Sequence, residues 1–191
     1  RDRFPTECAA ACQPRPPALP GAYWLVREIG DGVDPGSAEL ASRLTGVLKG
    51  YGADLGAGWG WLAAQALATS PGIEQLDLFE AEQSALACAR LNVFDPRARF
   101  HWADATQPPS KMRYDFIITN PPFHTGRATD PALGRSFIGA AKSMLTPSGK
   151  LYLVSNRQLA YEATLDETFS RWDVVHQTGR YKVIEARKPK K

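Results

Sequence analysis

The feature that most constrains the fold of this chain is a regular alternation of strand-like and helix-like segments. Apolar, β-branched runs at residues 73–79, 99–102, 114–119 and 150–155 alternate with helix-like segments at 61–69, 84–93, 131–144 and 159–169. A weaker run at 51–55, preceded by a helix over about 38–48, begins the series. Parallel strands need crossover connections, usually helices, so this pattern predicts an α/β fold with a mostly parallel, doubly wound sheet.

The carboxyl-terminal part of the chain predicts a different pairing. Runs at 172–177 and 180–186 are joined by Thr178-Gly179, which predicts an antiparallel hairpin and brings the sheet to seven strands. We interpret residues 1–22, rich in Pro and Ala, as a linker or extended arm, and 23–186 as one domain that begins with a short strand over 23–26. Residues 187–191 form a basic tail that either contacts phosphates or solubilises the chain end.

Cysteine usage and hydropathy limit the cellular context that the sequence predicts. Cys8, Cys12 and Cys88 are odd in number and lack the spacing of a metal site, so we expect neither a disulfide framework nor bound metal, and a cytoplasmic location. The uncharged stretch over 55–73 contains Gly, Gln, Thr, Ser and Pro, which argues against a membrane span.

The stretch Asn120-Pro121-Pro122-Phe123 directly follows the buried strand over 114–119. In an open α/β sheet, ligands bind at the carboxyl ends of the strands. Prolines fix the backbone of this turn and lack N–H groups, so an amide side chain and a bare carbonyl are held there before an aromatic ring. That combination suits a planar substrate that carries an amino group. Taken alone, the stretch is equally typical of a strand-terminating turn with a core phenylalanine.

A glycine-rich loop at residues 56–60 (GAGWG) joins the strand over 51–55 to the next helix. Glycines let the backbone approach a ligand closely and adopt positive φ. The dinucleotide fingerprint G-x-G-x-x-G would need its third glycine at Trp61, which argues against NAD or FAD. Asp54, just before the loop, is a candidate to hold an ammonium group. A glycine-rich turn without a ligand is the alternative.

Carboxylates follow two of the other predicted strands. Glu80 ends the strand over 73–79, about twenty residues beyond the glycine loop, where a carboxylate accepts hydrogen bonds from ribose hydroxyls. Asp104 follows the strand over 99–102 and is a candidate acceptor for an adenine amino group, with Ala105 beside it. Asp77 competes with Glu80, but it lies inside its strand and we interpret it as structural or exposed. Each acid alone is typical of a solvated strand end. Acids at the ends of successive strands indicate a ligand site more specifically.

Together, these motifs resemble the class I S-adenosylmethionine-dependent methyltransferases. Residues 54–60 match the first motif of that superfamily, Glu80 its ribose-binding acid, Asp104 its adenine-contacting acid, and residues 120–123 its amino-methylating N-P-P-[FYW] motif. Residues 34–37 (DPGS), 120–126 (NPPFHTG), 165–169 and 177–183 further resemble the ribosomal small-subunit RNA guanine-N2 methyltransferase C family. The resemblance covers about residues 24–186 and implies a Rossmann-like class I methyltransferase fold.

The resemblance also implies a cofactor and a set of site residues. The cofactor is S-adenosylmethionine, released as S-adenosylhomocysteine, and its implied ligands are Ser37, Asp54, Gly56, Ala57, Gly58, Glu80, Asp104, Ala105 and Asn120. The implied catalytic residues are Asn120, Pro121 and Phe123: the Asn120 oxygen and the Pro121 carbonyl each accept an amine N–H, and the Phe123 ring stacks on the base. The implied substrate-binding residues are Pro122, Phe123, His124 and Arg127. The residues alone favour a loop histidine satisfied by backbone at His124, and Arg127 is equally compatible with a solubilising surface position.

Three functional interpretations stay open on the sequence. The first is methylation of guanine N2, with ribosomal RNA or the small ribosomal subunit as the partner. The second is methylation of adenine N6 in nucleic acid or of a glutamine amide in a release factor, since the same motif serves both. The third is a non-catalytic RNA-binding assembly module that keeps the fold. The resemblance also implies an additional N-terminal domain, absent from this chain, as a partner.

Overall fold

A seven-stranded sheet in the order β10-β11-β9-β6-β3-β4-β5 organises the chain. The computed structural model describes residues 12–15, 23–26, 32–107, 112–122, 124–125, 128–129 and 131–190, with side chains described in 32–107, 112–122 and 131–190. The strands of the sheet are β3 (Lys49–Leu55), β4 (Gly72–Glu80), β5 (Ala98–Trp102), β6 (Tyr114–Thr119), β9 (Leu145–Asn156), β10 (Phe169–Gln177) and β11 (Tyr181–Pro189). Strand β11 pairs antiparallel with both β9 and β10, and the other four pairings in this sheet are parallel. The predicted doubly wound sheet with an antiparallel hairpin is confirmed.

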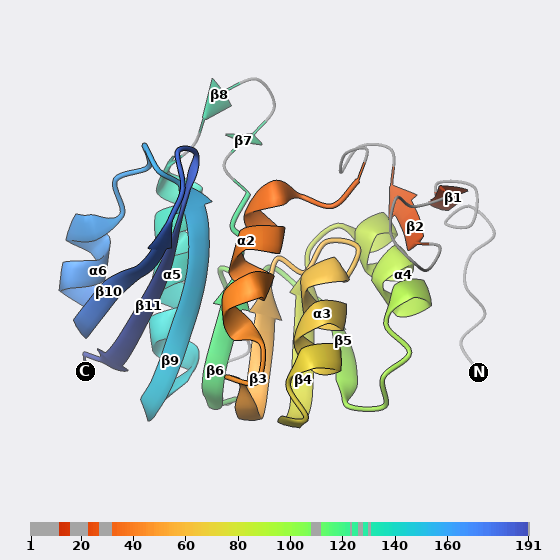
Figure 1. The fold of residues 1–191 in the computed structure, drawn as a ribbon, viewed down its shortest axis with the longest axis horizontal. Coiled ribbons are helices and arrows are strands. Elements are labelled where there is room, and N and C mark those ends of the chain that lie inside the picture. Colours follow the sequence, from red (N-terminus) through yellow and green to blue (C-terminus); the bar gives the residue numbers. More distant parts are fainter. Residues whose placement is uncertain are drawn as a thin grey trace.

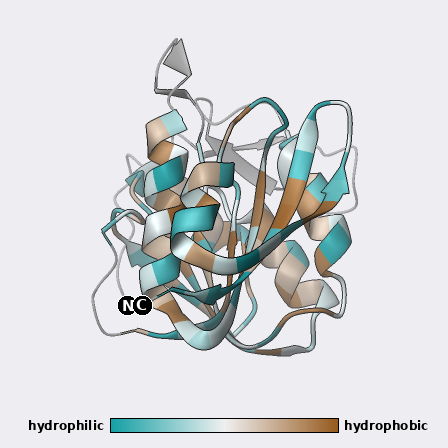
Figure 2. Cartoon of the chain, turned by 90° about the vertical axis from the view of Figure 1, so that its left-hand side faces the viewer, coloured by the Kyte–Doolittle hydropathy of each residue, from teal (hydrophilic) through white to brown (hydrophobic). Residues whose placement is uncertain are grey.

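Helices cover both faces of this sheet (Figure 1). The first face packs against α2 (Pro35–Leu44), α3 (Trp61–Thr69) and α4 (Gln83–Asn92), and the second against α5 (Pro131–Met144) and α6 (Glu162–Thr168). Successive side chains of β6 point to opposite faces, so Phe116 and Ile118 join the first core while Ile117 joins the second. Figure 2 shows hydrophobic residues on the strands between helices whose outer surfaces are hydrophilic.

The weakest predicted strand, over 51–55, is in fact the central strand β3, between β6 and β4. Packing explains why a glycine occupies position 52 in this strand. A Cβ on Gly52 would lie 1.9 Å from Cζ of Phe116 on β6, so the aromatic ring occupies the space that a side chain would need. Tertiary packing therefore overrides the low β propensity of this segment.

Several element boundaries differ from the prediction. Helix α2 begins at Pro35, because the Asp34 side chain accepts a hydrogen bond from the Ser37 backbone N–H at 2.8 Å and Pro35 suits the first helical position. Helix α6 begins at Glu162. Strand β9 takes in the predicted turn over 147–149, where its register with β6 shifts. Strand β11 continues past the predicted end at 186, and Arg187 pairs with Asp173 at 2.8 Å.

Two small two-stranded sheets lie outside the main sheet. Strand β1 (Cys12–Arg15) pairs with β2 (Tyr23–Val26), so a strand occurs in the segment for which the sequence predicts a linker or arm. Strand β7 (His124–Thr125) pairs with β8 (Ala128–Thr129). Cys88 is disulfide-bonded, which the odd cysteine count did not predict. No helix in the described ranges has the length and apolarity needed to cross a membrane.

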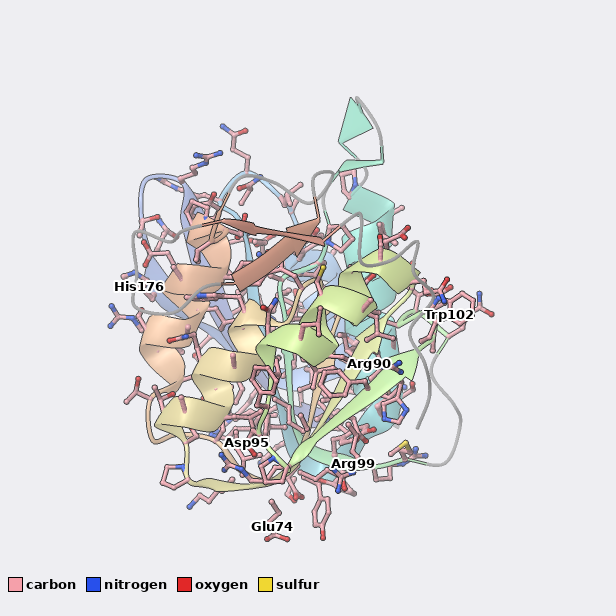
Figure 3. The ribbon with its side chains drawn as sticks, turned by 90° about the vertical axis from the view of Figure 1, so that its right-hand side faces the viewer. Glu74, Arg90, Asp95, Arg99, Trp102 and His176 are labelled. Carbon is pink, nitrogen blue, oxygen red and sulfur yellow. The ribbon has the colours of Figure 1, made fainter. Side chains whose placement is uncertain are left out.

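Strand β5 forms one edge of the sheet, and cationic and aromatic side chains cover it (Figure 3). The Arg99 guanidinium donates to the carbonyls of Pro96 and Ala98 at 2.6 and 2.8 Å. Trp102 is 64% exposed and donates its indole N–H to the Ala81 carbonyl at 2.9 Å. Charged side chains on an edge strand discourage pairing with another chain.

Two glycines of helix α5 provide a matched test of packing. A Cβ at Gly134 would lie 1.9 Å from the hydroxyl oxygen of buried Tyr161, whereas a Cβ at Gly139 meets nothing within 4 Å. We expect Gly134→Ala to lower the free energy of unfolding by about 1–3 kcal/mol through overpacking. Gly139→Ala is expected to raise it by up to about 1 kcal/mol, because alanine favours helix. Urea unfolding of both variants measures this; equal effects would contradict the packing around Tyr161.

Candidate active site

A cavity of about 460 Å³ lies at the carboxyl ends of β3, β4, β5 and β6. Its volume is in the range of small-molecule binding sites. All the residues that the sequence predicts to bind the cofactor line it: Ser37, Asp54, Gly56, Ala57, Gly58, Glu80, Asp104, Ala105 and Asn120. Pro121 and Pro122 line it as well. The fold thus brings together motifs that are far apart in the sequence.

The glycine loop orients the Glu80 carboxylate. Gly58, at φ +56°, donates its backbone N–H to Glu80 Oε2 at 2.8 Å, and the Glu82 N–H donates to Oε1 at 2.8 Å. Gly60 begins helix α3 at φ +87°, and a Cβ there would lie 2.8 Å from Val93 Cγ2. The positive φ angles need glycine, and they let the loop hold Glu80 at the cavity wall.

Asp54 is a buried acid in the wall of the cavity. It is 1% exposed, and its Oδ2 atom has no hydrogen-bond partner among the described residues. Burial, reinforced by the nearby Glu80 charge, raises the pKa of Asp54 to about 8, while a hydrogen bond from the Ala63 backbone acts in the opposite direction. A cation bound beside this carboxylate would favour its ionised form.

Asp104 is held by its own loop. Its Oδ1 atom accepts hydrogen bonds from the Thr106 hydroxyl at 2.7 Å and the Thr106 backbone N–H at 2.8 Å. These bonds, the hydroxyl first, hold the pKa of Asp104 below its usual value. The carboxylate is therefore oriented and ionised at neutral pH, next to buried Ala105.

Of the two interpretations that the sequence leaves for Asp77, the structure supports the structural one. It is fully buried, and its carboxylate accepts a hydrogen bond from the Tyr114 hydroxyl at 2.6 Å and lies 3.3 Å from His101 Nε2. Burial raises the pKa of Asp77, but the contacts with His101 and Tyr114 outweigh it and leave the pKa below its ordinary value. The side chain is outside the residues that line the cavity.

Asn120 is held at the end of β6 by two side chains of the α2 start. Its Nδ2 atom donates to Asp34 Oδ1 at 2.7 Å and to Ser37 Oγ at 2.9 Å. Both N–H groups of the amide are thereby used, and its carbonyl oxygen is turned away from Asp34 and Ser37. The preceding residue, buried Thr119, donates its hydroxyl to the Leu55 carbonyl at 2.8 Å and ties β6 to β3.

Part of the predicted substrate site lies outside the described residues. Phe123 and Arg127 belong to that part, and His124 is described only as backbone of β7. Their roles in stacking and substrate binding stay predictions. Pro121 is buried and Pro122 is exposed beside the cavity.

Sequence reasoning missed several residues of the cavity. The resemblance includes Asp34 in the DPGS motif without giving it a role, yet Asp34 lines the cavity and contacts Asn120. Trp61 lines the cavity with a buried indole N–H that has no partner among the described residues. Phe137 of α5 lines it too, but its position in an amphipathic helix is that of any core residue.

Comparison with known protein families decides what kind of domain this is. The family model described as methyltransferase small domain matches residues 29–185, most of the chain. The chain belongs to this family. The matched range includes every strand of the seven-stranded sheet except the last residues of β11, and every residue of the cavity named above.

Curated proteins similar to this methyltransferase small domain are named as ribosomal RNA methyltransferases. The chain is 38% identical over 169 residues to "Ribosomal RNA small subunit methyltransferase C" of Salmonella arizonae, covering 86% of this chain and 47% of the relative. The protein of the same name from Cronobacter sakazakii is 38% identical over 172 residues, covering 88% and 48%. The chain spans about half the length of these curated relatives.

Solved structures agree with the fold. The T. thermophilus 16S rRNA N2 methyltransferase (RsmC), in complex with AdoMet and guanosine, superposes with a TM-score of 0.71 at 28% identity, over 89% of this chain and 48% of that one. A putative RNA methyltransferase from Pyrococcus horikoshii superposes with a TM-score of 0.61 at 21% identity, over 79% and 82%, and supports the fold alone.

Proposed function

We propose that this methyltransferase small domain transfers a methyl group from S-adenosylmethionine to the exocyclic N2 amine of guanine in small-subunit ribosomal RNA. The observation that carries the proposal is the Asn120 amide, held by Asp34 and Ser37 beside a cavity that contains three strand-end acids. The similarity to relatives named for methylation of small-subunit ribosomal RNA supports the substrate class.

The residues of the cavity fit this cofactor. Buried Asp54, with an unpartnered oxygen, suits the ammonium of the methionine part. Glu80, oriented by two backbone N–H groups, suits the ribose hydroxyls, and Asp104 suits the adenine amino group. The glycines between them let the backbone approach the ligand closely. When bound, the cofactor supplies a methyl group activated by a sulfonium.

The chain itself provides orientation. The lone pair of an exocyclic amine is delocalised into the base, so the amine is a poor nucleophile. The Asn120 side-chain oxygen and the Pro121 carbonyl each accept one N–H and direct the lone pair at the methyl carbon. The nitrogen–carbon bond forms as the carbon–sulfur bond breaks, and the amine proton then leaves to solvent. No strong general base is required.

Binding of the cofactor to Asp54 is expected to depend on pH. Folding raises the pKa of this acid from 3.8 to about 8, so the folded state holds the proton more tightly and the free energy of unfolding falls as pH rises between these values. An ammonium ligand needs the carboxylate, so its binding releases a proton below pH 8. We expect affinity to increase roughly tenfold per pH unit from 6 to 8 and then to level off.

Isothermal titration calorimetry at several pH values and in buffers of different ionisation enthalpy measures both effects. Asp54→Asn is the control, because it keeps any titration of the ligand and removes that of the protein. An equally steep profile in this variant would contradict the assignment of Asp54.

Parallel labelling tests the substrate. The chain and S-adenosylmethionine with a labelled methyl group are incubated with small ribosomal subunits, naked ribosomal RNA, DNA and release factor, and labelled products are digested and identified. The proposal expects N2-methylguanosine from ribosomal RNA or subunits. Label in N6-methyladenosine would make adenine the acceptor, and label in a glutamine amide would make the release factor the acceptor. Cofactor binding without methyl transfer to any of the four substrates would favour an assembly module.

We also propose that the cytoplasm is the site of action, and that an additional N-terminal domain contributes to substrate selection, since the chain spans about half the length of its curated relatives. The labelling assay tests this partner when it is repeated with the chain fused to the half of such a relative that it does not match. Faster labelling of the same guanine would support a role in selection, and unchanged rate and site would contradict it.

A further inference from the structure

We infer that Asp34 is a positioning residue that acts through Asn120 in methyl transfer. The inference rests on the proposed function and goes beyond it, because there Asp34 only holds Asn120 and does not determine which end of the amide faces the amine. One carboxylate oxygen, Oδ1, accepts from Asn120 Nδ2 at 2.7 Å and from the Ser37 backbone N–H at 2.8 Å. The same atom therefore caps helix α2 and holds the motif at the end of β6, 86 residues away in the sequence.

The first consequence concerns which end of the Asn120 amide meets the substrate. The oxygen and nitrogen ends of an amide have nearly the same shape, so packing alone does not distinguish them. If the amide were flipped, its oxygen would face the Asp34 carboxylate, and two acceptors would lie at hydrogen-bond distance without a proton between them. Asp34 has no donor when ionised, so it excludes this orientation. The Asn120 oxygen is thereby fixed as the group that faces the amine.

Ser37 cannot fix the orientation alone. Its hydroxyl accepts from Asn120 Nδ2 at 2.9 Å, but a hydroxyl can also donate and would accept either orientation of the amide. Of the two partners, only the carboxylate is acceptor-only. The discrimination between the two amide ends therefore resides in Asp34.

The second consequence concerns charge. The attacking nitrogen becomes positive as the new bond to carbon forms, and its N–H groups become stronger donors to the Asn120 oxygen. A carboxylate bonded to the other end of the same amide polarises it and increases the negative charge on that oxygen. Asp34 is exposed in the free protein, so solvent screening limits this effect. The proton of the amine still leaves to solvent, and Asp34 does not receive it.

Asp34→Asn separates these roles from the cap. Asparagine caps helices as well as aspartate does and still accepts hydrogen bonds, so the fold is expected to be unchanged. It removes the charge, and its own amide can donate to a flipped Asn120. We expect kcat to fall about tenfold or more, with KM for the cofactor and the midpoint of thermal unfolding unchanged. Asp34→Ala is expected to lower kcat further and also to lower the unfolding midpoint.

A second measurement is independent of the substrate. The side-chain NH2 signals of Asn120 are assigned in a ¹⁵N–¹H spectrum by their absence in Asn120→Ala. We expect them to shift upfield in Asp34→Asn, because they lose a charged acceptor, and to move less in Ser37→Ala. Unchanged signals would overturn the inference.

The kinetic outcomes are equally distinct. An unchanged kcat in Asp34→Asn would overturn the positioning role. A raised dissociation constant for S-adenosylmethionine at unchanged kcat would make Asp34 a cofactor ligand instead. If the labelling assay assigns adenine or glutamine as the acceptor, a drop in kcat with that acceptor would support Asp34 while the guanine assignment fails.

Discussion

Asn120→Ala is expected to lower kcat about 100- to 1,000-fold and to leave the dissociation constant of S-adenosylmethionine nearly unchanged. The variant loses the oxygen that accepts an amine N–H, an interaction that strengthens as the amine becomes positive. The hydrogen bonds to Asp34 and Ser37 show that the side chain is fixed before any ligand arrives. Single-turnover methylation with labelled cofactor measures the rate of the chemical step, and calorimetry measures binding.

Asn120→Asp is the matched control. It keeps the size of the side chain and an oxygen that faces the amine, but its second oxygen would face the Asp34 carboxylate at the place of the present 2.7 Å bond. We expect it to be nearly as inactive as the alanine variant, because repulsion moves the side chain. A tenfold or greater loss of cofactor binding in Asn120→Ala would mean that the residue binds the cofactor more than it orients the acceptor.

Glu80→Gln is expected to weaken S-adenosylmethionine binding about 100-fold, because each hydrogen bond from a ribose hydroxyl to a charged carboxylate contributes roughly 1.5–3 kcal/mol. The loop around Glu80 also contributes to the expected loss of affinity. Glu80 accepts backbone N–H groups from Gly58 and Glu82 on its two oxygens, so the amide group of glutamine would place a donor against a donor on one side. Calorimetric titration measures the change.

Glu74→Gln is the control for charge. Glu74 is an exposed residue at the opposite end of the same strand, labelled in Figure 3, and its replacement removes one negative charge far from the cavity. We expect Glu74→Gln to bind S-adenosylmethionine with the affinity of the unchanged protein. Glu80→Gln is also expected to move the pH profile of binding to lower pH, since the Glu80 charge helps raise the pKa of Asp54. An unchanged affinity in Glu80→Gln would contradict the assignment of Glu80 to the ribose hydroxyls.

The sequence predicts the sheet and the cavity well where the information is local. Strand ends are marked by a change from apolar residues to Asp, Glu or Asn, and parallel strands place their carboxyl ends at one edge, so Glu80, Asp104 and Asn120 could be expected together. The amino-terminal cap of α2 is local as well, because Asp34, Pro35 and Ser37 are neighbours in the sequence, although the predicted helix begins only at about residue 38.

The rest depends on contacts between distant segments, which a single sequence does not reveal. Gly52 weakens a strand prediction because glycine disfavours strands, yet the ring of Phe116 on the neighbouring strand requires it. The second role of Asp34 depends on a partner 86 residues away. The raised pKa of Asp54 arises from burial by the completed fold.

The buried carboxylate of Asp54 has a consequence for inhibitor discovery. In the free protein near neutral pH it carries a proton, and a ligand with an ammonium group must displace that proton, whereas a ligand with a neutral polar group can accept a hydrogen bond from it. Compounds of the same shape are therefore expected to be ranked differently at pH 6.5 and pH 8.5. Amines should gain at the higher pH and neutral isosteres at the lower, so a screen run at both values would separate the two chemotypes without structural work.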